Sequence, residues 1–560
     1  MSAVMAKDGE LGAIFKAYDV RGVVPSELDC RRSFAIGAGF ARFARLAADA
    51  SRLAVAHDMR ISGVELAGSF IAGAESAGTE VVLIGLASTD LLYYASGVLA
   101  APGAMLTASH NPPEYNGIKF CLSGAKPVGE DSGLAEIRRG AQEVLATLGA
   151  ELPAPRATLD GRDWLGEFAR HVRSFVDLSC LAPLRVVADA ANGMGGLIAP
   201  AVFEGLPCAL EMLYGELDGT FPNHPANPLE WENLEDLRAR ILESGADLGL
   251  AFDGDADRVF LVDELGEPLS GSTTTAIVAR AMLEKHPGAT VLYNVICSKT
   301  VPEVIAENGG VGVRTRVGHS FIKARMAETD AVFAGEHSGH YYFRENFGAD
   351  SGIIAAVVVL EALSRAKVTL SQLRRPFERY ADSGERNSHV GDTTAVVAAL
   401  ARHFAKKGPS VDTLDGLTVD FGDWWCNVRP SNTEPLLRLN VEATDQASCA
   451  RHVDELETLI RRADRGTLEG AIDLDPFLVS LLVDPEDKGP LWYFAEEATL
   501  YNPRLRRRYA VRDGIPVLLV AESENLDAAE AARLEARASA AVVTGTGPDG
   551  PATPGRPARG

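Results

Sequence analysis

The sequence is poor in the features that mark several large classes of protein. Its seven cysteines are scattered over 560 residues without a CxxC pair, so neither a disulfide framework nor a cysteine zinc site is indicated. It contains no apolar run of the ~20 residues that a membrane span requires, and its N-terminus lacks the apolar core of a signal peptide. GxSxG, the local signature of a hydrolase nucleophile, is also absent. These absences favour a soluble cytoplasmic protein without a membrane partner.

The chain has fewer basic residues than acidic ones. Lysine and arginine number 54 against 77 aspartates and glutamates, which gives a net charge of −23. Such a balance argues against nucleic acid as a partner and leaves an anionic ligand to local, cation-lined sites. The basic run LRRR (505–508) is short enough to be a solvated turn or a docking contact.

Short β-branched runs that end in polar turns and are followed by helix-period segments recur along the chain. Examples are LAVAHDMR (53–60), RVVADAANGMGG (185–196) and TVLYNVICSK (290–299). This alternation is typical of α/β domains, and the length predicts three to five domains. We expect α/β domains at 1–155, 156–258 and 259–372, a smaller α+β domain at 373–466, a module at 470–523, and a helix with a disordered tail at 524–560.

The one GxGxxG of the chain, Gly545, Gly547 and Gly550, lies in that tail. A dinucleotide site needs a helix that begins on the glycines, and PATPGRPARG follows instead. We therefore interpret these glycines as flexible chain.

Three aspartates at alternate positions form a pattern suited to a metal. In LGLAFDGDADRVFLVDE (248–264) an apolar run leads into Asp253, Asp255 and Asp257, and a second apolar run begins at Val259. Carboxylates this close repel one another unless a cation lies among them, and their oxygens suit Mg²⁺. A solvated acidic turn is the alternative, but two flanking strands would hold the carboxylates together at a strand end, where α/β proteins build sites.

An EF-hand is a second metal-binding interpretation of this stretch. Glu264 falls at position 12 of a loop that starts at Asp253, as that motif requires. Position six, however, is Arg258 where the loop needs glycine, and VFLV reads as a strand where the motif needs a helix. The spacing therefore favours a different carboxylate site.

Two further polar stretches interrupt apolar sequence. AGEHSGHYYF (334–343) places Glu336, Ser338 and His340 at alternate positions, and on an extended loop these side chains would point the same way, toward adjacent hydroxyls of a sugar. NVRPSNTEPLLRL (427–439) offers a guanidinium, hydroxyls and an amide, which suit a phosphate. Ordinary polar loops are the alternative for each stretch. With the aspartate loop, they indicate a phosphorylated, hydroxyl-rich ligand.

Taken together, four stretches carry a specific resemblance. TASHNPPEYNGIKF (107–120), DGDADRV, GEHSGHYYF and RPSNTEPLLRL resemble, in order, the four signature loops of the α-D-phosphohexomutase family, especially its bacterial phosphomannomutase/phosphoglucomutase branch. FKAYDVRG (15–22) resembles the N-terminal motif of that family. The resemblance covers about residues 10–465. It implies three successive mixed α/β domains and a smaller α+β fourth domain around a central cleft.

The resemblance gives Ser109 the role of an active-site serine that carries a phosphoryl group. A phosphoserine beside Asp253, Asp255 and Asp257 would complete a Mg²⁺ site through a phosphate oxygen. The implied reaction is the reversible interconversion of hexose 1-phosphate and hexose 6-phosphate. Hexose 1,6-bisphosphate is the implied intermediate and activator.

The other roles implied by the resemblance fall on residues that match the family's loops. The candidates for proton transfer and for charge stabilisation are His110, Lys119, Arg258, His319 and Arg21. The candidates for binding the sugar are Glu336, Ser338 and His340, and those for the distal phosphate are Arg429, Ser431, Asn432 and Thr433.

Substrate preference rests on smaller differences. GEHSGH resembles mannose-competent members of the family, so we expect mannose phosphate first, glucose phosphate second, and glucosamine phosphate as a weaker alternative. The sequence departs from dual-specificity relatives at Ile296, where they carry a basic residue; Lys299 is the nearby cation.

The segment 473–521 lies outside the mutase resemblance. KGPL and YAVRDGIPVLL resemble the Trm112-like family, some of whose members bind zinc and act as partner subunits of methyltransferases. Asp484 stands where the CP of a zinc-binding member would begin, and no cysteine follows Cys449, so a thiolate zinc site is excluded here. A protein partner is the expectation for this module. The non-enzyme alternative for the whole chain is a sugar-phosphate sensor that recruits such a partner.

Overall fold

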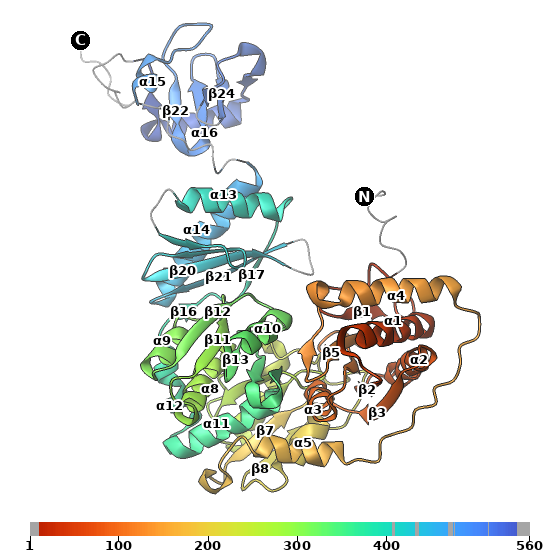
Figure 1. The fold of residues 1–560 in the computed structure, drawn as a ribbon. Helices are drawn as coiled ribbons and strands as arrows, with labels where there is room; N and C mark the ends of the chain where they lie inside the picture. Colours follow the sequence, from red (N-terminus) through yellow and green to blue (C-terminus); the bar gives the residue numbers. More distant parts are fainter. Residues whose placement is uncertain are drawn as a thin grey trace. The chain divides into compact units, whose positions relative to one another are not determined.

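A computed structural model describes residues 11–405, 409–431, 436–466, 468, 474, 476–512 and 515–545 (Figure 1). The chain forms two compact units, residues 1–380 and residues 381–560, and each is described by itself. Among the described helices, none combines the length and the apolar character that crossing a membrane demands.

The first sheet of the N-terminal unit has the strand order β1-β5-β4-β2-β3, with β6 paired to β5. β2 is parallel to β3 and β4, whereas β5 is antiparallel to β4 and β1. The strands are β1 (Val20–Val23), β2 (Arg52–His57), β3 (Glu80–Leu86), β4 (Gly103–Leu106), β5 (Tyr115–Leu122) and β6 (Lys126–Pro127). The helices are α1 (Cys30–Ala48), α2 (Gly63–Ser76), α3 (Thr89–Leu99) and α4 (Leu134–Thr147).

Strand β2 shows why this sheet is covered on both faces. Leu53 and Val55 belong to one hydrophobic cluster, with residues of α1, α2 and α4, whereas Ala54 and Ala56 belong to another, with residues of α3. Successive side chains of a strand point to opposite faces, so a continuous apolar run requires cover on both. The run LAVA in the sequence therefore places α3 on the face opposite α1 and α2.

The second sheet has the order β10-β9-β7-β8. Its strands are β7 (Arg185–Asp189), β8 (Ala209–Leu213), β9 (Leu248–Phe252) and β10 (Val259–Asp263), and its helices are α5 (Trp164–Arg173), α6 (Gly195–Phe203) and α7 (Glu235–Ser244). β9 and β10 form an antiparallel hairpin in which Val259 lies opposite Phe252. The predicted domain boundary after Arg258 is therefore wrong, because it would divide this hairpin.

The third sheet has the order β12-β11-β13-β14-β15. Its strands are β11 (Thr290–Asn294), β12 (Val311–Thr315), β13 (Phe333–Gly335), β14 (Tyr341–Phe343) and β15 (Ala349–Asp350). Its helices are α8 (Gly271–Lys285), α9 (Thr300–Glu307), α10 (His319–Thr329), α11 (Gly352–Ala366) and α12 (Leu370–Arg374). β11 is parallel to β12 and β13, and β13 and β14 form an antiparallel hairpin.

One continuous hydrophobic cluster runs through all three sheets. It includes Met105 of the first sheet, Leu250 of the second and Phe333 of the third, together with the nearly wholly buried helix α11. Loops that leave different sheets are thus held by a shared core, which fixes their distances from one another.

The second unit begins with an antiparallel sheet of order β16-β21-β20-β19-β18, with β17 paired to β21. The strands are β16 (Ala381–Asp382), β17 (Arg386–His389), β18 (Ser410–Asp412), β19 (Leu417–Asp420), β20 (Trp424–Pro430) and β21 (Leu436–Ala443). Two helices, α13 (Thr393–Ala405) and α14 (Gln446–Asp464), bury their apolar sides in the same core as β20 and β21. This agrees with the predicted α+β unit.

The C-terminal module contains a sheet of order β25-β24-β23-β22-β27, with β26 paired to β24. Its strands are β22 (Trp492–Phe494), β23 (Thr499–Asn502), β24 (Arg507–Arg512), β25 (Ile515–Pro516), β26 (Glu524–Asn525) and β27 (Val542–Val543), and its helices are α15 (Pro476–Leu481) and α16 (Ala528–Ala536).

The module is longer than the sequence indicated. The predicted end after Ser523 is wrong, because β26 pairs with β24 and β27 pairs with β22. The predicted helix is present as α16, whose Leu534 packs with Phe494 and Tyr501. The predicted disordered tail therefore cannot begin before residue 546. Residues 546–560, and with them Gly547 and Gly550, lie outside the described part of the chain.

Candidate active site

Ser109 lies just beyond the end of β4, at the edge where the parallel strands of the first sheet finish. Its backbone has a φ of 49°, in the left-handed region that a residue with a side chain rarely adopts. The amide of Ser109 donates to the Thr107 hydroxyl at 2.9 Å, and the Ser109 Oγ donates to Oδ2 of Asp253 at 2.6 Å. An unusual backbone conformation thus aims the serine hydroxyl at the aspartate loop.

The aspartate loop is the turn of the β9–β10 hairpin. Asp253, Asp255 and Asp257 are almost completely buried, and each offers an oxygen within 4.8 Å of the oxygens of the other two. Gly254 allows this loop to approach the serine loop, because a Cβ there would stand 2.3 Å from the carbonyl oxygen of Ser109. The prediction that two flanking strands hold the carboxylates together at a strand end is confirmed.

The donor atoms of this loop fit a hard divalent cation. Oδ1 of Asp255 and Oδ1 of Asp257 are buried without a hydrogen-bond partner, and leaving a buried carboxylate oxygen unsatisfied is costly. Burial raises the pKa of Asp253 to about 6, against the attraction of Arg258. Burial acts in the same direction on Asp255, but Lys119 and Thr89 outweigh it and lower the pKa of that carboxyl. Carboxylates with free oxygens are the ligands that Mg²⁺ prefers.

Cationic side chains surround the serine and the aspartates. Nζ of Lys119, on β5, lies 2.6 Å from Oδ2 of Asp255 and 2.5 Å from Oδ2 of Asp257. Nε of Arg258 lies 3.0 Å from Oδ2 of Asp253. This arrangement is able to attract a phosphate and to balance the charge of three carboxylates.

Two more predicted residues, His110 and Arg21, contact the serine, its loop or Arg258. The His110 Nδ1 lies 2.5 Å from the Arg258 guanidinium and 3.4 Å from the Ser109 Oγ. Arg21 donates to the Ala108 carbonyl and, at 2.6 Å, to Oδ1 of Asn111. The five cationic or basic groups expected near the serine therefore include four that contact its loop or the aspartates directly: His110, Lys119, Arg258 and Arg21.

The loop that carries Glu336, Ser338 and His340 is a tight turn between β13 and β14. The Gly339 amide donates to the Glu336 carbonyl at 3.1 Å, and the Glu336 amide donates to the His340 carbonyl at 2.9 Å. The prediction of an extended loop with three parallel side chains is therefore wrong, because hairpin hydrogen bonds close the chain on itself. Glu336 is buried, whereas Ser338 and His340 are half-buried.

Glu336 is held by three donors. Its Oε1 accepts from Nδ2 of Asn294 and from the amide of Gly318, both at 3.2 Å, and its Oε2 accepts from the Tyr342 hydroxyl at 2.7 Å. A carboxylate fixed in this way presents its remaining lone pairs in one orientation, as recognition of a sugar hydroxyl requires.

His340 links this turn to the aspartate loop. Its Nδ1 lies 3.0 Å from Oδ2 of Asp350 and 3.9 Å from Oδ1 of Asp257. Burial would lower the pKa of His340, but these two carboxylates outweigh it and raise the pKa. His340 also forms an isolated β-bridge with Arg258. The predicted sugar loop and metal loop are thus neighbours.

His319 is the first residue of α10. Its ring lies 5.2 Å from the ring of Tyr18, which belongs to the N-terminal FKAYDVRG stretch, and the contact is edge-on. Burial and the charge of Lys323 lower the pKa of His319 to about 3. The side chain is therefore neutral at pH 7, as a proton acceptor must be.

The predicted phosphate loop lies in the second unit. Arg429, near the end of β20, is buried and lies 3.1 Å from Glu385, and the Ser431 amide donates to the Leu436 carbonyl at 2.9 Å. Asn432 and Thr433 lie outside the described residues. Ile296, where the family resemblance led us to expect a basic residue, is buried in the turn after β11.

Two residues that contact this site were not predicted. Arg60, after β2, donates four hydrogen bonds to backbone carbonyls of residues 109–115. Thr89, the first residue of α3, donates its hydroxyl to Oδ2 of Asp255 at 2.5 Å. No local pattern in the sequence indicated either residue, because each acts on a segment that is distant in sequence.

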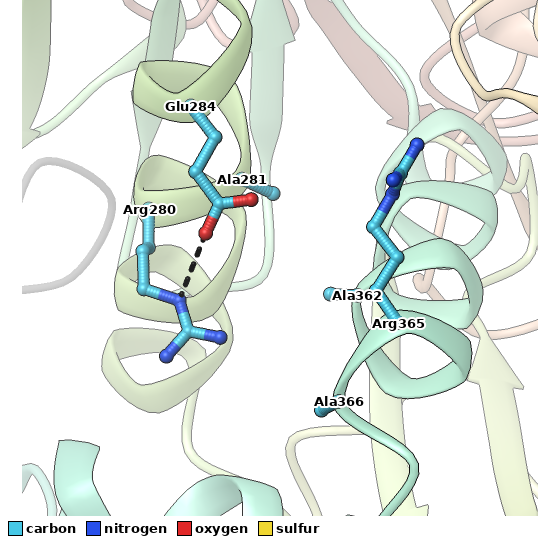
Figure 2. Close-up of a pocket in the computed structure, with 6 residues that line it drawn as sticks. All are labelled: Arg280, Ala281, Glu284, Ala362, Arg365 and Ala366. Atoms are coloured by element: carbon cyan, nitrogen blue, oxygen red, sulfur yellow. Dashed lines mark ion pairs between the residues drawn. The ribbon is translucent and has the colours of Figure 1, made fainter. Parts of the chain in front are cut away.

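A hollow of about 210 Å³ lies elsewhere in the first unit, between α8 and α11 (Figure 2). Arg280 pairs with Glu284 at 3.6 Å (Figure 2). Arg365 pairs with Glu361 at 2.7 Å. Since both arginines are paired with carboxylates, this hollow is a poor match for a sugar phosphate, and the serine–aspartate cluster remains the candidate site.

Comparisons with known proteins agree with this geometry. Four descriptions of phosphoglucomutase/phosphomannomutase match in order: alpha/beta/alpha domain I at residues 12–145, domain II at 166–266, domain III at 270–380 and the C-terminal domain at 385–459. A Trm112p-like protein description matches residues 475–514.

Individual relatives are similar over most of their length. A protein of Xanthomonas campestris pv. campestris (strain B100) named "Phosphohexose mutases" is 39% identical over 450 residues, which are 80% of this chain and 99% of that protein. A Salmonella typhimurium phosphomannomutase is 36% identical over 439 residues, 77% of this chain and 94% of the relative.

Solved structures are similar as well. The crystal structure of a phosphoglucomutase/phosphomannomutase family protein from Burkholderia thailandensis has a TM-score of 0.73 and 32% identity, and the match covers 81% of this chain and 98% of that one. Because the four domain descriptions match in order and both relatives are more than 30% identical over more than nine-tenths of their own length, the chain belongs to the phosphoglucomutase/phosphomannomutase family.

Proposed function

We propose that this chain is a phosphohexomutase that interconverts mannose 6-phosphate and mannose 1-phosphate. The observation that carries the proposal is the 2.6 Å hydrogen bond from the Ser109 Oγ to Asp253, inside a cluster of buried carboxylates and cations. A hydrolase would need a base to activate the serine, whereas a serine that shuttles a phosphoryl group needs charge balance around the phosphate.

The proposed reaction has two transfers. The bond between phosphorus and the Ser109 Oγ breaks while a bond forms to the free hydroxyl of a hexose phosphate, and the proton of that hydroxyl passes to a nearby base. The bisphosphate then turns. The bond between its other phosphate and the sugar oxygen breaks while that phosphorus bonds to the Ser109 Oγ, and the freed sugar oxygen takes back the proton. The sum is an exchange of the phosphate between the 1- and 6-positions, with hexose 1,6-bisphosphate as intermediate and as the activator that phosphorylates resting enzyme.

We assign roles to residues by their place in the site. His319 is neutral at pH 7 and is the candidate base, while Lys119, His110, Arg258 and Arg21 stabilise the charge of the transferring group. Glu336, Ser338 and His340 are assigned to the sugar, and Arg429, Ser431, Asn432 and Thr433 to the distal phosphate.

We assign the aspartate loop to Mg²⁺. Asp253, Asp255 and Asp257, with an oxygen of the phosphate on Ser109, would hold one ion. When bound, the ion supplies positive charge beside the transferring phosphorus. The free oxygens of Asp255 and Asp257 support this assignment.

Mannose is proposed as the preferred sugar because relatives of Salmonella typhimurium and Escherichia coli are named phosphomannomutase. A relative of Pseudomonas syringae pv. tomato is named phosphomannomutase/phosphoglucomutase, so glucose phosphate is the second candidate and glucosamine phosphate the third. Seven unpaired cysteines fit a reducing compartment, and we place the reaction in the cytoplasm.

The test is a coupled assay on mannose 1-phosphate, glucose 1-phosphate and glucosamine 1-phosphate with Mg²⁺ and a trace of hexose 1,6-bisphosphate. Wild-type protein, Ser109→Ala and the control Ser26→Ala, an exposed serine of the same domain, are compared. Turnover is expected in wild type and control and absent in Ser109→Ala, with mannose 1-phosphate converted fastest. Folded, phosphorylated wild-type protein that converts none of the three sugars would overturn the proposal and favour a sensor.

A further inference from the structure

The segment LAVAHDMR ends in an arginine that the reaction described above does not use. Arg60 follows β2, and its side chain has no exposed surface. Burying a guanidinium is strongly unfavourable unless its charge is paired and its donors are satisfied. The partners of Arg60 therefore indicate why it is there.

Those partners are the backbone of the serine loop. One terminal nitrogen, NH1, donates to the carbonyls of Pro112 and Tyr115, both at 2.8 Å. The other, NH2, donates to the carbonyls of Ser109 at 2.8 Å and Asn111 at 2.7 Å. A single side chain thus gathers four carbonyls of a seven-residue stretch, an arrangement that suits the planar, multi-donor guanidinium.

The charge of Arg60 is balanced by Asp58, two residues earlier. Nε of Arg60 lies 3.3 Å from Oδ2 of Asp58, and Oδ1 of Asp58 accepts from the Arg60 amide at 3.0 Å. Neither side chain is exposed. Asp58 and Arg60 are therefore fixed relative to each other, because both groups are held on the same short stretch of chain.

A loop of the second domain packs against Arg60. The ring of Phe221 lies over the guanidinium at 5.2 Å, and a Cβ on Gly219 would stand 2.6 Å from Cα of Arg60. On the far side, the carbonyl oxygen of Ser109 faces Gly254 of the aspartate loop, where a Cβ would stand at 2.3 Å. Arg60 therefore sets the position of a carbonyl that is in contact with the metal loop.

We propose that Arg60 is the positioning residue of the serine loop, which holds Ser109 in its left-handed conformation with the hydroxyl directed at Asp253. This inference rests on the proposed function for its catalytic readout. Arg60 acts through the backbone and contacts neither the substrate nor the transferring group. Its effect is thus expected in the rate of transfer and not in the affinity for the sugar phosphate.

The experiment compares Arg60→Lys with Arg31→Lys. Lysine keeps the charge beside Asp58 but has three donors on one atom and cannot span four carbonyls. Arg31 is a matched control, because it also donates to two backbone carbonyls, those of Leu148 and Gly149, at the end of α4. For each variant, kcat and KM for mannose 1-phosphate are measured together with amide hydrogen exchange.

For Arg60→Lys we expect kcat to fall at least about 100-fold with KM within about threefold, a size known for small misplacements of reacting groups. Exchange of the amides of residues 109–115 should rise at least tenfold while β2 and β4 stay protected. Arg60→Gly should recover at least tenfold in kcat with millimolar guanidinium, and not with ammonium. Arg31→Lys should match wild type.

A folded Arg60→Lys with kcat within threefold of wild type and unchanged exchange in 109–115 overturns the proposal. If Arg60→Lys does not fold, Gly219→Ala tests the same proposal with the same measurements. This substitution displaces the backbone of Arg60 and leaves the guanidinium present. If wild-type protein turns over no hexose phosphate, the proposed function fails alone, because the exchange measurement still decides the role of Arg60.

Discussion

The Ser109 hydroxyl and the Asp253 carboxylate lie 144 positions apart in the chain and meet through a 2.6 Å hydrogen bond. The serine follows strand β4 of the first sheet, and the aspartate lies in the β9–β10 hairpin of the second sheet. Their contact depends on close approach of two loops at Gly254, where a Cβ would stand 2.3 Å from the Ser109 carbonyl oxygen. The geometry of the site is therefore sensitive to the bulk of a single residue.

Gly254→Ala is expected to separate the two loops. The added methyl group must push the Ser109 carbonyl away, which costs about 1–3 kcal/mol of stability, and kcat should fall at least about tenfold. Thermal denaturation and the coupled assay measure the two effects. Gly161→Ala is the control, because nothing lies within 4 Å of a Cβ there, and it should leave both quantities unchanged. Wild-type kcat in Gly254→Ala would show that the loops do not need this approach.

Lys119 is expected to stabilise the apoprotein. Its ammonium lies within 2.6 Å of both Asp255 and Asp257, which are buried. Lys119→Met leaves two carboxylates uncompensated, so in EDTA the free energy of unfolding of the first unit should drop by about 3 kcal/mol. Added Mg²⁺ should restore part of this loss if the aspartates bind it.

Chemical denaturation in EDTA and in Mg²⁺ measures the effect. Lys126→Met, on the exposed end of β6, is the control and should show neither change. Equal stability of Lys119→Met and wild type in EDTA would contradict the prediction, because the carboxylates would then need no neighbouring cation.

Asp90 should make stability depend on pH. Burial raises the pKa of Asp90 to about 7, although hydrogen bonds from Ser88 and Ser351 oppose the shift. Between the unfolded value of 3.8 and about 7, the folded protein holds a proton that the unfolded chain has lost. The stabilisation is complete below pH 3.8 and is lost as pH rises through about 7, by an amount on the order of a few kcal/mol.

Asp90→Asn should remove this part of the pH dependence. Asparagine keeps an acceptor for Ser88 and a donor toward Ser351 but does not titrate, so its melting temperature relative to wild type should rise between pH 5 and pH 8. Thermal melts at several pH values measure the difference. A parallel pH profile in both proteins would mean that Asp90 stays charged throughout.

The C-terminal module should be separable from catalysis. The family descriptions for the mutase end at residue 459, and the Trm112p-like match begins at residue 475. A chain truncated after Arg465 is expected to retain kcat and KM within about twofold and to lose any partner captured by the full chain. A large loss of turnover in folded, truncated protein would instead assign the module to the enzyme.

The sequence predicted the parts of the site that are encoded locally. The aspartates were identified from their spacing, and the serine loop and Lys119 from the resemblance of one short stretch to a family motif. Arg60 and Thr89 were not, since an arginine bonded to backbone carbonyls and a threonine at a helix start leave no local pattern. The turn at Glu336–His340 was predicted as extended, because spacing alone does not reveal which backbone hydrogen bonds close a hairpin.

The fold, like the site, was predicted only where a local stretch of sequence carries a pattern. Apolar runs predicted β2 and β9 and the helices between them, while the two-residue strands β26 and β27 are too short to carry a periodicity. The end of the module was therefore placed too early. The basic run 505–508 was expected to be a solvated turn or a docking contact. Arg507 and Arg508 instead belong to β24 and pair with Glu486, Glu524 and Glu530, which lie outside the run.

The hydrophobic cluster shared by the first three sheets has a consequence for how this site persists through evolution and engineering. Sheets joined by a common core gain or lose their structure together, so a fragment that carries the serine loop alone would lack the surroundings that aim it. Domain exchange between relatives is then best attempted with all three sheets as one block. The geometry of the site therefore depends on all three sheets together. Substitutions of apolar residues deep in that core are able to alter the chemistry although every polar residue is unchanged.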